Sequence, residues 1–219
     1  SLSTKDVMIS FATQPGTASA GVDFTAVTGT VTIPAGAQSG TITIPIIDDN
    51  IDELDETFTV KLSNPVNAVL GNATATVTIE DDDISVIRIS DASADETSST
   101  LDFRVSLSNP SSRAVTAAYA TTADSATEGL DYVRATGTLT IPAGSLGVTI
   151  PVTLVDDELI EGDERFYITL SGASVPIGQS VATGTILDDE VPTGSEVSFF
   201  GWQYPNGAVF RGDLSYQDF

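Results

Sequence analysis

Short runs of alternating apolar and polar residues dominate the chain, and they predict β-strands. Residues 30–33 read Thr-Val-Thr-Ile, residues 41–44 read Thr-Ile-Thr-Ile, and residues 58–62 read Phe-Thr-Val-Lys-Leu. Because successive side chains of a strand point to opposite faces, such runs build sheets with one apolar and one polar face. Gly, Pro, Asn and Asp separate the runs, and long helical periodicity is absent. We therefore expect an all-β protein with antiparallel sheets.

The pattern occurs twice, with an offset of 108 residues. The segment at residues 21–36 reads GVDFTAVTGTVTIPAG, and the one at residues 129–144 reads GLDYVRATGTLTIPAG. The same offset pairs IIDDNIDELDETFTVKLS with LVDDELIEGDERFYITLS, which starts at residue 154. This period is the size of one β-sandwich domain. We predict two tandem immunoglobulin-like sandwiches, domain 1 (residues 1–83) and domain 2 (residues 84–190).

The two copies differ at their N-terminal ends. In the second copy, residues 84–114 precede the match at Val115, and they include the strand-like run LDFRVSLS. In the first copy only six residues precede the corresponding match at Val7. We therefore predict that domain 1 lacks its own strands A and B.

Residues 191–219 form an aromatic tail, which holds seven of the fifteen aromatic residues. Its strand-like runs flank a Pro-Asn-Gly turn, which is typical of a β-hairpin. FRGDLS at residues 210–215 also matches FRVSLS at residues 103–108. Three hypotheses stay open. The tail begins a further repeat, it completes domain 1 of another copy in a head-to-tail fibre through residues 194–219, or it folds back on its own chain.

Composition excludes several classes of function. The chain has 31 acidic and 8 basic residues, and a net charge of −23 repels nucleic acid and anionic membranes. It has no Cys and no His, which removes Cys/His zinc sites, thiol nucleophiles and imidazole bases. No apolar run approaches the length of a membrane span, so we expect no membrane insertion.

Acidic residues recur in register at the ends of the predicted strands. Loops at one end of a sandwich converge, so these motifs are expected to meet at one pole. Carboxylates brought together repel one another unless a cation neutralises them. Flexible cages of six to eight oxygen atoms suit Ca²⁺, whereas Mg²⁺ demands a tighter octahedron. A solvated acidic rim is the alternative interpretation. The candidate residues are Asp23, Asp48, Asp49, Glu53, Asp81, Asp82 and Asp83 in domain 1, and Glu96, Asp131, Asp156, Asp157, Glu161, Asp188, Asp189 and Glu190 in domain 2.

Taken together, the motifs GxDY/F, GTxTIPAG, DDxxxExxExF and TIxDDD resemble the Calx-β domain family, over residues 7–83 and 84–190. That family includes domains of sodium–calcium exchangers, of integrin β4 and matrix proteins, and of bacterial surface adhesins. The resemblance implies an immunoglobulin-like sandwich that binds Ca²⁺ at the pole next to the following domain. It also implies that the fifteen acidic residues named above are the Ca²⁺ ligands.

These features predict a secreted or cell-surface structural and adhesive module, in which Ca²⁺ stiffens the junction between Asp83 and Ile84. Its partners would be calcium ions and neighbouring repeats or copies of itself. One alternative is a calcium-sensing regulatory pair, as in the exchangers, and another is carbohydrate binding through Trp202 and Tyr204. Paired carboxylates also serve glycoside hydrolysis. We nevertheless expect no enzyme, because the acids recur identically in both copies and stand in Asp-Asp runs.

Overall fold

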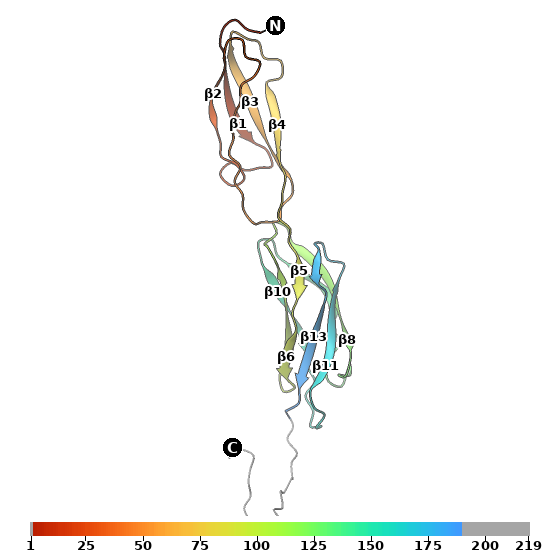
Figure 1. Cartoon of the computed structure of the whole chain (residues 1–219). Coiled ribbons are helices and arrows are strands. Elements are labelled where there is room, and N and C mark those ends of the chain that lie inside the picture. The colour runs from red at the N-terminus through yellow and green to blue at the C-terminus, as the bar shows by residue number, and fades with distance from the viewer. Residues whose placement is uncertain (1, 190–219) are drawn as a thin grey trace, which may run out of the picture.

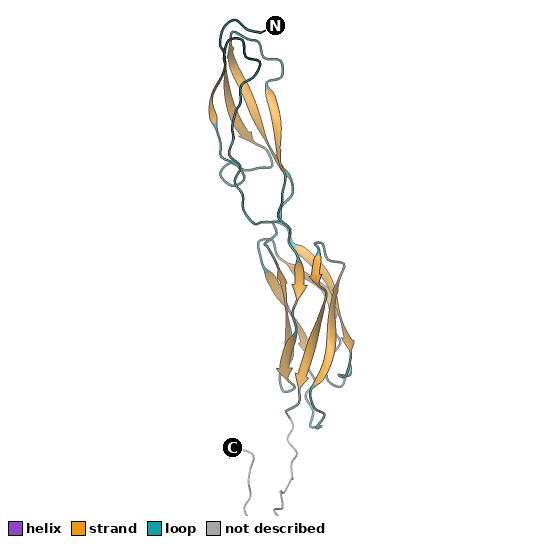
Figure 2. Ribbon diagram, viewed as in Figure 1, coloured by secondary structure: helices purple, strands orange, loops and turns teal. Residues whose placement is uncertain are grey.

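The computed structural model describes residues 2–189, which contain strands and loops but no helix. The strands form two groups that lie end to end, with β1–β4 in domain 1 and β5–β13 in domain 2 (Figure 1). Loops alone connect the strands (Figure 2). Among these residues, no helix has the length and hydropathy needed to cross a membrane. The prediction of an all-β protein is confirmed.

Domain 1 contains a single antiparallel sheet in the order β2-β1-β3-β4. Its strands are β1 (Val7–Pro15), β2 (Thr28–Ile33), β3 (Glu56–Val66) and β4 (Thr74–Ile79). The apolar positions of the alternating runs face the same side, where Phe58 and Val60 of β3 are buried. Phe24 stacks on Phe58, with ring centroids 4.1 Å apart. This stack is the centre of a small core.

Domain 2 contains two sheets, in the orders β10-β7-β5-β12 and β6-β13-β11-β8-β9. Most neighbouring strands are antiparallel, but β12 pairs with β5 and β13 pairs with β6 in parallel. The strands are β5 (Ile87–Ile89), β6 (Ala92–Asp95), β7 (Thr100–Leu107), β8 (Val115–Ala123), β9 (Thr136–Ile141), β10 (Gly147–Thr153), β11 (Glu164–Ser171), β12 (Ile177–Gln179) and β13 (Val181–Leu187).

The core of domain 2 lies between its two sheets. Phe103 of β7 meets Phe166 of β11 edge to face, with ring centroids 5.7 Å apart. Tyr132 stacks on Phe166, with ring centroids 4.3 Å apart. All three rings are fully buried, and such aromatic residues contribute a large share of the buried apolar area. The predicted sandwich is therefore present in domain 2.

Domain 1 lacks the sheet that covers this core in domain 2. Residues 39–45 are the counterpart of β10, yet they form no strand. In domain 2, β10 pairs along its whole length with β7, and residues 2–83 contain no counterpart of β7. Ile42 is consequently only partly buried, whereas its counterpart Ile150 is 3% exposed. The predicted absence of strands A and B from domain 1 is confirmed.

This difference predicts unequal protection of two matching segments against hydrogen exchange. Amides in residues 39–45 should exchange roughly a thousandfold faster than those in residues 147–153, because only the latter are held in a strand ladder. Hydrogen exchange followed by mass spectrometry measures both segments in one sample. Equal protection would show that residues 39–45 have a strand partner.

The predicted tail at residues 191–219 lies outside the described residues, together with the three hypotheses about its pairing. The division at residues 83 and 84 stays a prediction, and the names domain 1 and domain 2 are kept for these segments.

Candidate metal centre

Asp23 and Asp131 occupy the same turn in the two domains. The glycine two residues before each aspartate has a φ of 88°, which a side chain would strain. Asp23 Oδ2 accepts a hydrogen bond of 2.6 Å from the backbone N–H of Ser19, and Asp131 Oδ2 accepts one of 2.6 Å from that of Thr127. The recurring GxD motif is therefore a turn that holds an aspartate in a defined position.

Two glutamates approach each of these aspartates. One comes from the loop before β3 or β11, and the other is the first residue of that strand. In each group, one carboxylate oxygen of every residue lies within 4.8 Å of the others. We call these groups the acidic triads, which are Asp23, Glu53 and Glu56 in domain 1, and Asp131, Glu161 and Glu164 in domain 2.

The triads are electrostatically strained without a cation. Burial, followed by a hydrogen bond with Asp131 and the charge of that residue, raises the pKa of Glu164 to about 7. Burial and the same two effects of Asp23 raise the pKa of Glu56 to about 7. A proton shared within each triad thus relieves part of the repulsion. A cation bound there would relieve it more completely.

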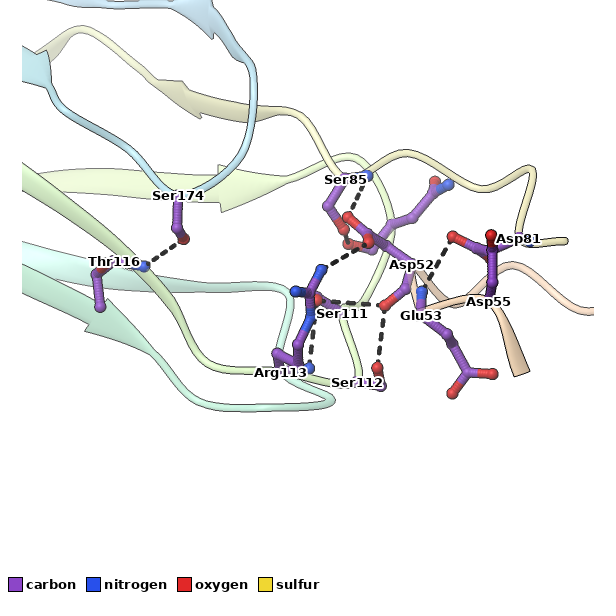
Figure 3. A network of polar contacts seen from close by, with 11 residues as sticks. Asp52, Glu53, Asp55, Asp81, Ser85, Ser111, Ser112, Arg113, Thr116 and Ser174 are labelled. Atoms are coloured by element: carbon purple, nitrogen blue, oxygen red, sulfur yellow. Dashed lines mark hydrogen bonds and ion pairs between the residues drawn. The ribbon is translucent and has the colours of Figure 1, made fainter. Parts of the chain in front are cut away.

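In domain 1, all seven predicted residues line one cavity, together with Glu56. Asp81 Oδ2 accepts a hydrogen bond of 3.1 Å from the backbone N–H of Glu53 (Figure 3). Partial burial, and then the negative charges of Asp23, Asp49 and Asp81, raise the pKa of Glu53. The three acidic motifs predicted to converge do so at the pole that faces domain 2 (Figure 1).

In domain 2, the corresponding cavity is lined by fewer of the predicted residues, namely Glu96, Asp131, Glu161 and Asp188, together with Glu164. Glu96 is 6% exposed, and burial raises its pKa although a backbone hydrogen bond of 3.3 Å from Asp157 opposes the shift. Asp188 Oδ2 accepts a hydrogen bond of 3.1 Å from the N–H of Gly162.

The other predicted residues of domain 2 are placed differently. Asp156, Asp157 and Asp189 do not line this cavity, and Glu190 lies outside the described residues. Asp157 Oδ1 accepts a hydrogen bond of 2.7 Å from the N–H of Leu159, as Oδ1 of its counterpart Asp49 accepts one of 2.8 Å from that of Ile51. The assignment of individual ligands stays a prediction.

Three residues that matter for these poles were missing from the predicted set. Glu56 and Glu164 complete the triads, and their signal was the second glutamate of the recurring motif DDxxxExxExF. Asp52 is buried against domain 2. Its signal was a departure from the repeat, because the second copy has Ile160 at this position.

The family model described as "Calx-beta domain" matches residues 2–83 and 80–190. The chain belongs to the Calx-beta domain family. The resemblance found in its motifs, to a tandem pair of Calx-beta domains, is therefore confirmed.

Curated relatives of this Calx-beta pair are exchangers. The chain is 32% identical over 165 residues to "Sodium/calcium exchanger Calx" of Drosophila melanogaster. This match covers 73% of the chain and 17% of the relative. The chain is also 31% identical over 190 residues to "Sodium/calcium exchanger 1" of Canis lupus familiaris, in a match that covers 76% of the chain and 20% of that relative. The Calx-beta pair thus spans about a fifth of the length of these relatives.

A solved structure described as "calcium binding domain CBD12 of CALX1.1" is also similar. It is 23% identical, with a TM-score of 0.42, and the match covers 83% of this chain and 87% of that one.

The predicted role as an extracellular structural and adhesive module is wrong. The relatives of this Calx-beta pair are named as sodium/calcium exchangers, and the same finding contradicts the secreted or cell-surface location. A strongly acidic surface suits either side of a membrane, and a chain without cysteine carries no disulfide signal for its compartment. The head-to-tail fibre through residues 194–219 finds no support in the comparisons.

Proposed function

We propose that the chain is a calcium-sensing regulatory pair, in which each domain binds Ca²⁺ at its acidic pole. The observation that carries the proposal is the acidic triad, which recurs at the same place in both domains with its oxygens within 4.8 Å. All of its donors are carboxylate oxygens, which suits a hard cation, and Ca²⁺ accepts six to eight such ligands in variable geometry. The exchanger relatives support a regulatory role.

The triads would provide the central ligands, and the flanking carboxylates would complete the cages. In domain 1, we propose Asp48, Asp49, Asp81, Asp82 and Asp83 as further ligands, because they line the same cavity as the triad. In domain 2, we propose Glu96 and Asp188 as further ligands, because they line the same cavity as the triad. Additional candidate ligands of this domain are Asp156, Asp157, Asp189 and Glu190. Bound Ca²⁺ would supply positive charge to the pole, where it would replace the proton of Glu56 or Glu164.

We further propose that the pair is a non-catalytic part of a larger exchanger-like protein, on the intracellular side of the membrane. Its matched segment makes up about a fifth of each exchanger relative, which leaves transport itself to other parts of those proteins. Carbohydrate binding depended on Trp202 and Tyr204, which lie outside the described residues.

Isothermal titration of the full chain with CaCl₂ tests this function. Both domains should take up Ca²⁺, and MgCl₂ at the same ionic strength should bind at least about tenfold more weakly, because Mg²⁺ demands a tight octahedron and loses its bound water reluctantly. Glu164→Gln and Glu56→Gln should each remove binding from one domain alone. A chain that binds neither cation, or that binds Mg²⁺ as tightly as Ca²⁺, would overturn the proposed function.

A further inference from the structure

Asp52 lies in the same loop as the proposed ligands Asp49 and Glu53, yet its side chain does not join the triad. It points toward domain 2, whereas the carboxylate of Glu53 points away from it (Figure 3). Asp52 is 9% exposed, and the partners of its polar contacts belong to the other domain. An aspartate this deeply buried needs hydrogen bonds or a counter-charge to offset its desolvation.

The backbone of Asp52 pairs with domain 2 on both of its sides. Its N–H donates a hydrogen bond of 3.0 Å to the carbonyl oxygen of Pro110, and its carbonyl oxygen accepts one of 2.9 Å from the N–H of Ser112. These two bonds form an isolated parallel β-bridge with Ser111. Ser111 is itself fixed within domain 2, because its carbonyl oxygen accepts a hydrogen bond of 2.8 Å from Gly144.

The carboxylate of Asp52 makes a second set of contacts across the junction. Its Oδ2 accepts a hydrogen bond of 2.9 Å from the backbone N–H of Ser85, which is fully buried. Its Oδ1 lies 3.7 Å from Nη2 of Arg113. The arginine side chain is 56% exposed, so this ion pair contributes little. The bond from Ser85 is charge-assisted and buried, which makes it the stronger contact.

The repeat shows that the acidic pole itself does not require an aspartate here. The equivalent residue in domain 2 is Ile160, which is followed by the same glutamates and is 58% exposed. Both poles have an acidic triad, but only the pole of domain 1 lies against a further described domain. The aspartate at position 52 is therefore explained by the contact between the domains and not by the cation site.

We propose that Asp52 is a positioning residue that holds domain 2 against the acidic loop of domain 1 without any cation. Its neighbour Glu53 belongs to the triad, so the ligand loop and the junction share one short segment of backbone. Cation binding at the domain 1 site therefore affects the contact with domain 2 through this segment. This coupling between the cation site and domain 2 rests on the proposed function. The contact by which Asp52 holds the two domains together, which we call the tether, does not. It also differs from the expectation that Ca²⁺ is what stiffens the junction between Asp83 and Ile84.

The tether is tested by ¹⁵N relaxation of the full chain in EGTA. In the wild type, the two domains should share one rotational correlation time. Asp52→Ala keeps the backbone bridge to Ser111 but loses the buried bond from Ser85, so the ratio of docked to undocked orientations should fall about tenfold. The correlation times of the two domains should therefore shorten and diverge. Asp52→Asn keeps an oxygen that accepts from Ser85, so it should stay close to the wild type.

Ile160→Ala is the matched control at the same loop position of domain 2, and it should change nothing. The amide spectra show whether both domains remain folded in each variant. Independent tumbling of the wild type in EGTA would overturn the proposal. So would unchanged tumbling of Asp52→Ala, or equal loosening by Ile160→Ala.

A calcium titration of the same samples tests the coupling. Asp52→Ala should weaken Ca²⁺ binding in domain 1 several-fold and leave domain 2 unchanged, and equal affinities for wild type and variant would overturn the coupling. A wild type that binds no Ca²⁺ would refute the proposed function and with it the coupling. The relaxation data in EGTA would still decide whether Asp52 holds the domains together.

Discussion

Asp131→Asn is expected to abolish the stabilisation of domain 2 by Ca²⁺ and, at the same time, to stabilise that domain in EGTA. The asparagine oxygen can still accept the hydrogen bond from Thr127, so the turn is kept. The variant removes the negative charge that, together with burial, raises the pKa of Glu164. Without that charge, the carboxylates of the pole repel one another less, and the triad has lost one of the three negative charges that would bind a divalent cation.

The expected loss is large. A site in domain 2 occupied at a hundred times its dissociation constant stabilises the folded state by about 2.7 kcal/mol, and the variant should lose this amount. Differential scanning calorimetry in CaCl₂ and in EGTA, at matched ionic strength, measures the difference. Asp23→Asn is the matched control, because it should remove the stabilisation by Ca²⁺ from domain 1 and leave that of domain 2 unchanged. A calcium response that survives in domain 2 of Asp131→Asn would exclude the triad as the binding site.

Calcium affinity is expected to fall about tenfold for each pH unit below 7, because one proton per triad must be displaced by the ion. The pKa of Glu56 and that of Glu164 are both raised to about 7, from 4.5. Between pH 4.5 and 7, the folded state therefore binds more protons than the unfolded state. These two groups then make the protein in EGTA less stable as the pH rises through this window.

Saturating Ca²⁺ should reverse that trend, since the ion competes better as the protons leave. Thermal unfolding at pH 5, 6, 7 and 8, in EGTA and in Ca²⁺, should give curves that diverge as the pH rises. The difference between the wild type and Glu164→Gln isolates the contribution of this glutamate from those of other carboxylates. Parallel curves in the two media would mean that proton and cation do not share the triad.

Much of the fold follows from local patterns in the sequence. Alternation at Phe58 and Val60 places both side chains on one face of β3, because the side-chain period of a strand is two. The offset of 108 residues predicts two domains of the same kind, and the missing run before Val7 predicts the absent strands. The consequence of that absence, the loss of strand structure at residues 39–45, needed the structure, since a strand requires a partner as well as a pattern.

The acidic poles were predictable as regions but not as sets of ligands. Asp131 stands in a recurring turn motif, so its place at the acidic pole could be inferred from the sequence of that motif alone. Glu164 begins a strand, where an acidic residue is equally typical of a solvent-exposed face, and it was missed. Asp157 was included and stays a prediction, since its Oδ1 accepts a bond from its own loop as that of its counterpart Asp49 does. The direction of a side chain in a loop depends on backbone angles that a list of carboxylates does not contain.

Asp52 shows most clearly where sequence reasoning ends. It stands in the stretch DDNIDELDE, among acids that are chemically identical to it. The sequence by itself determined the all-β class, the tandem repeat and the two acidic poles, because these depend on residue type and spacing along the chain. Only the tertiary structure decided which carboxylates form the triads and that Asp52 bonds to Ser85 of the other domain. Contacts of this kind join residues far apart in the chain, so they are set by how the strands and domains pack and not by neighbouring letters.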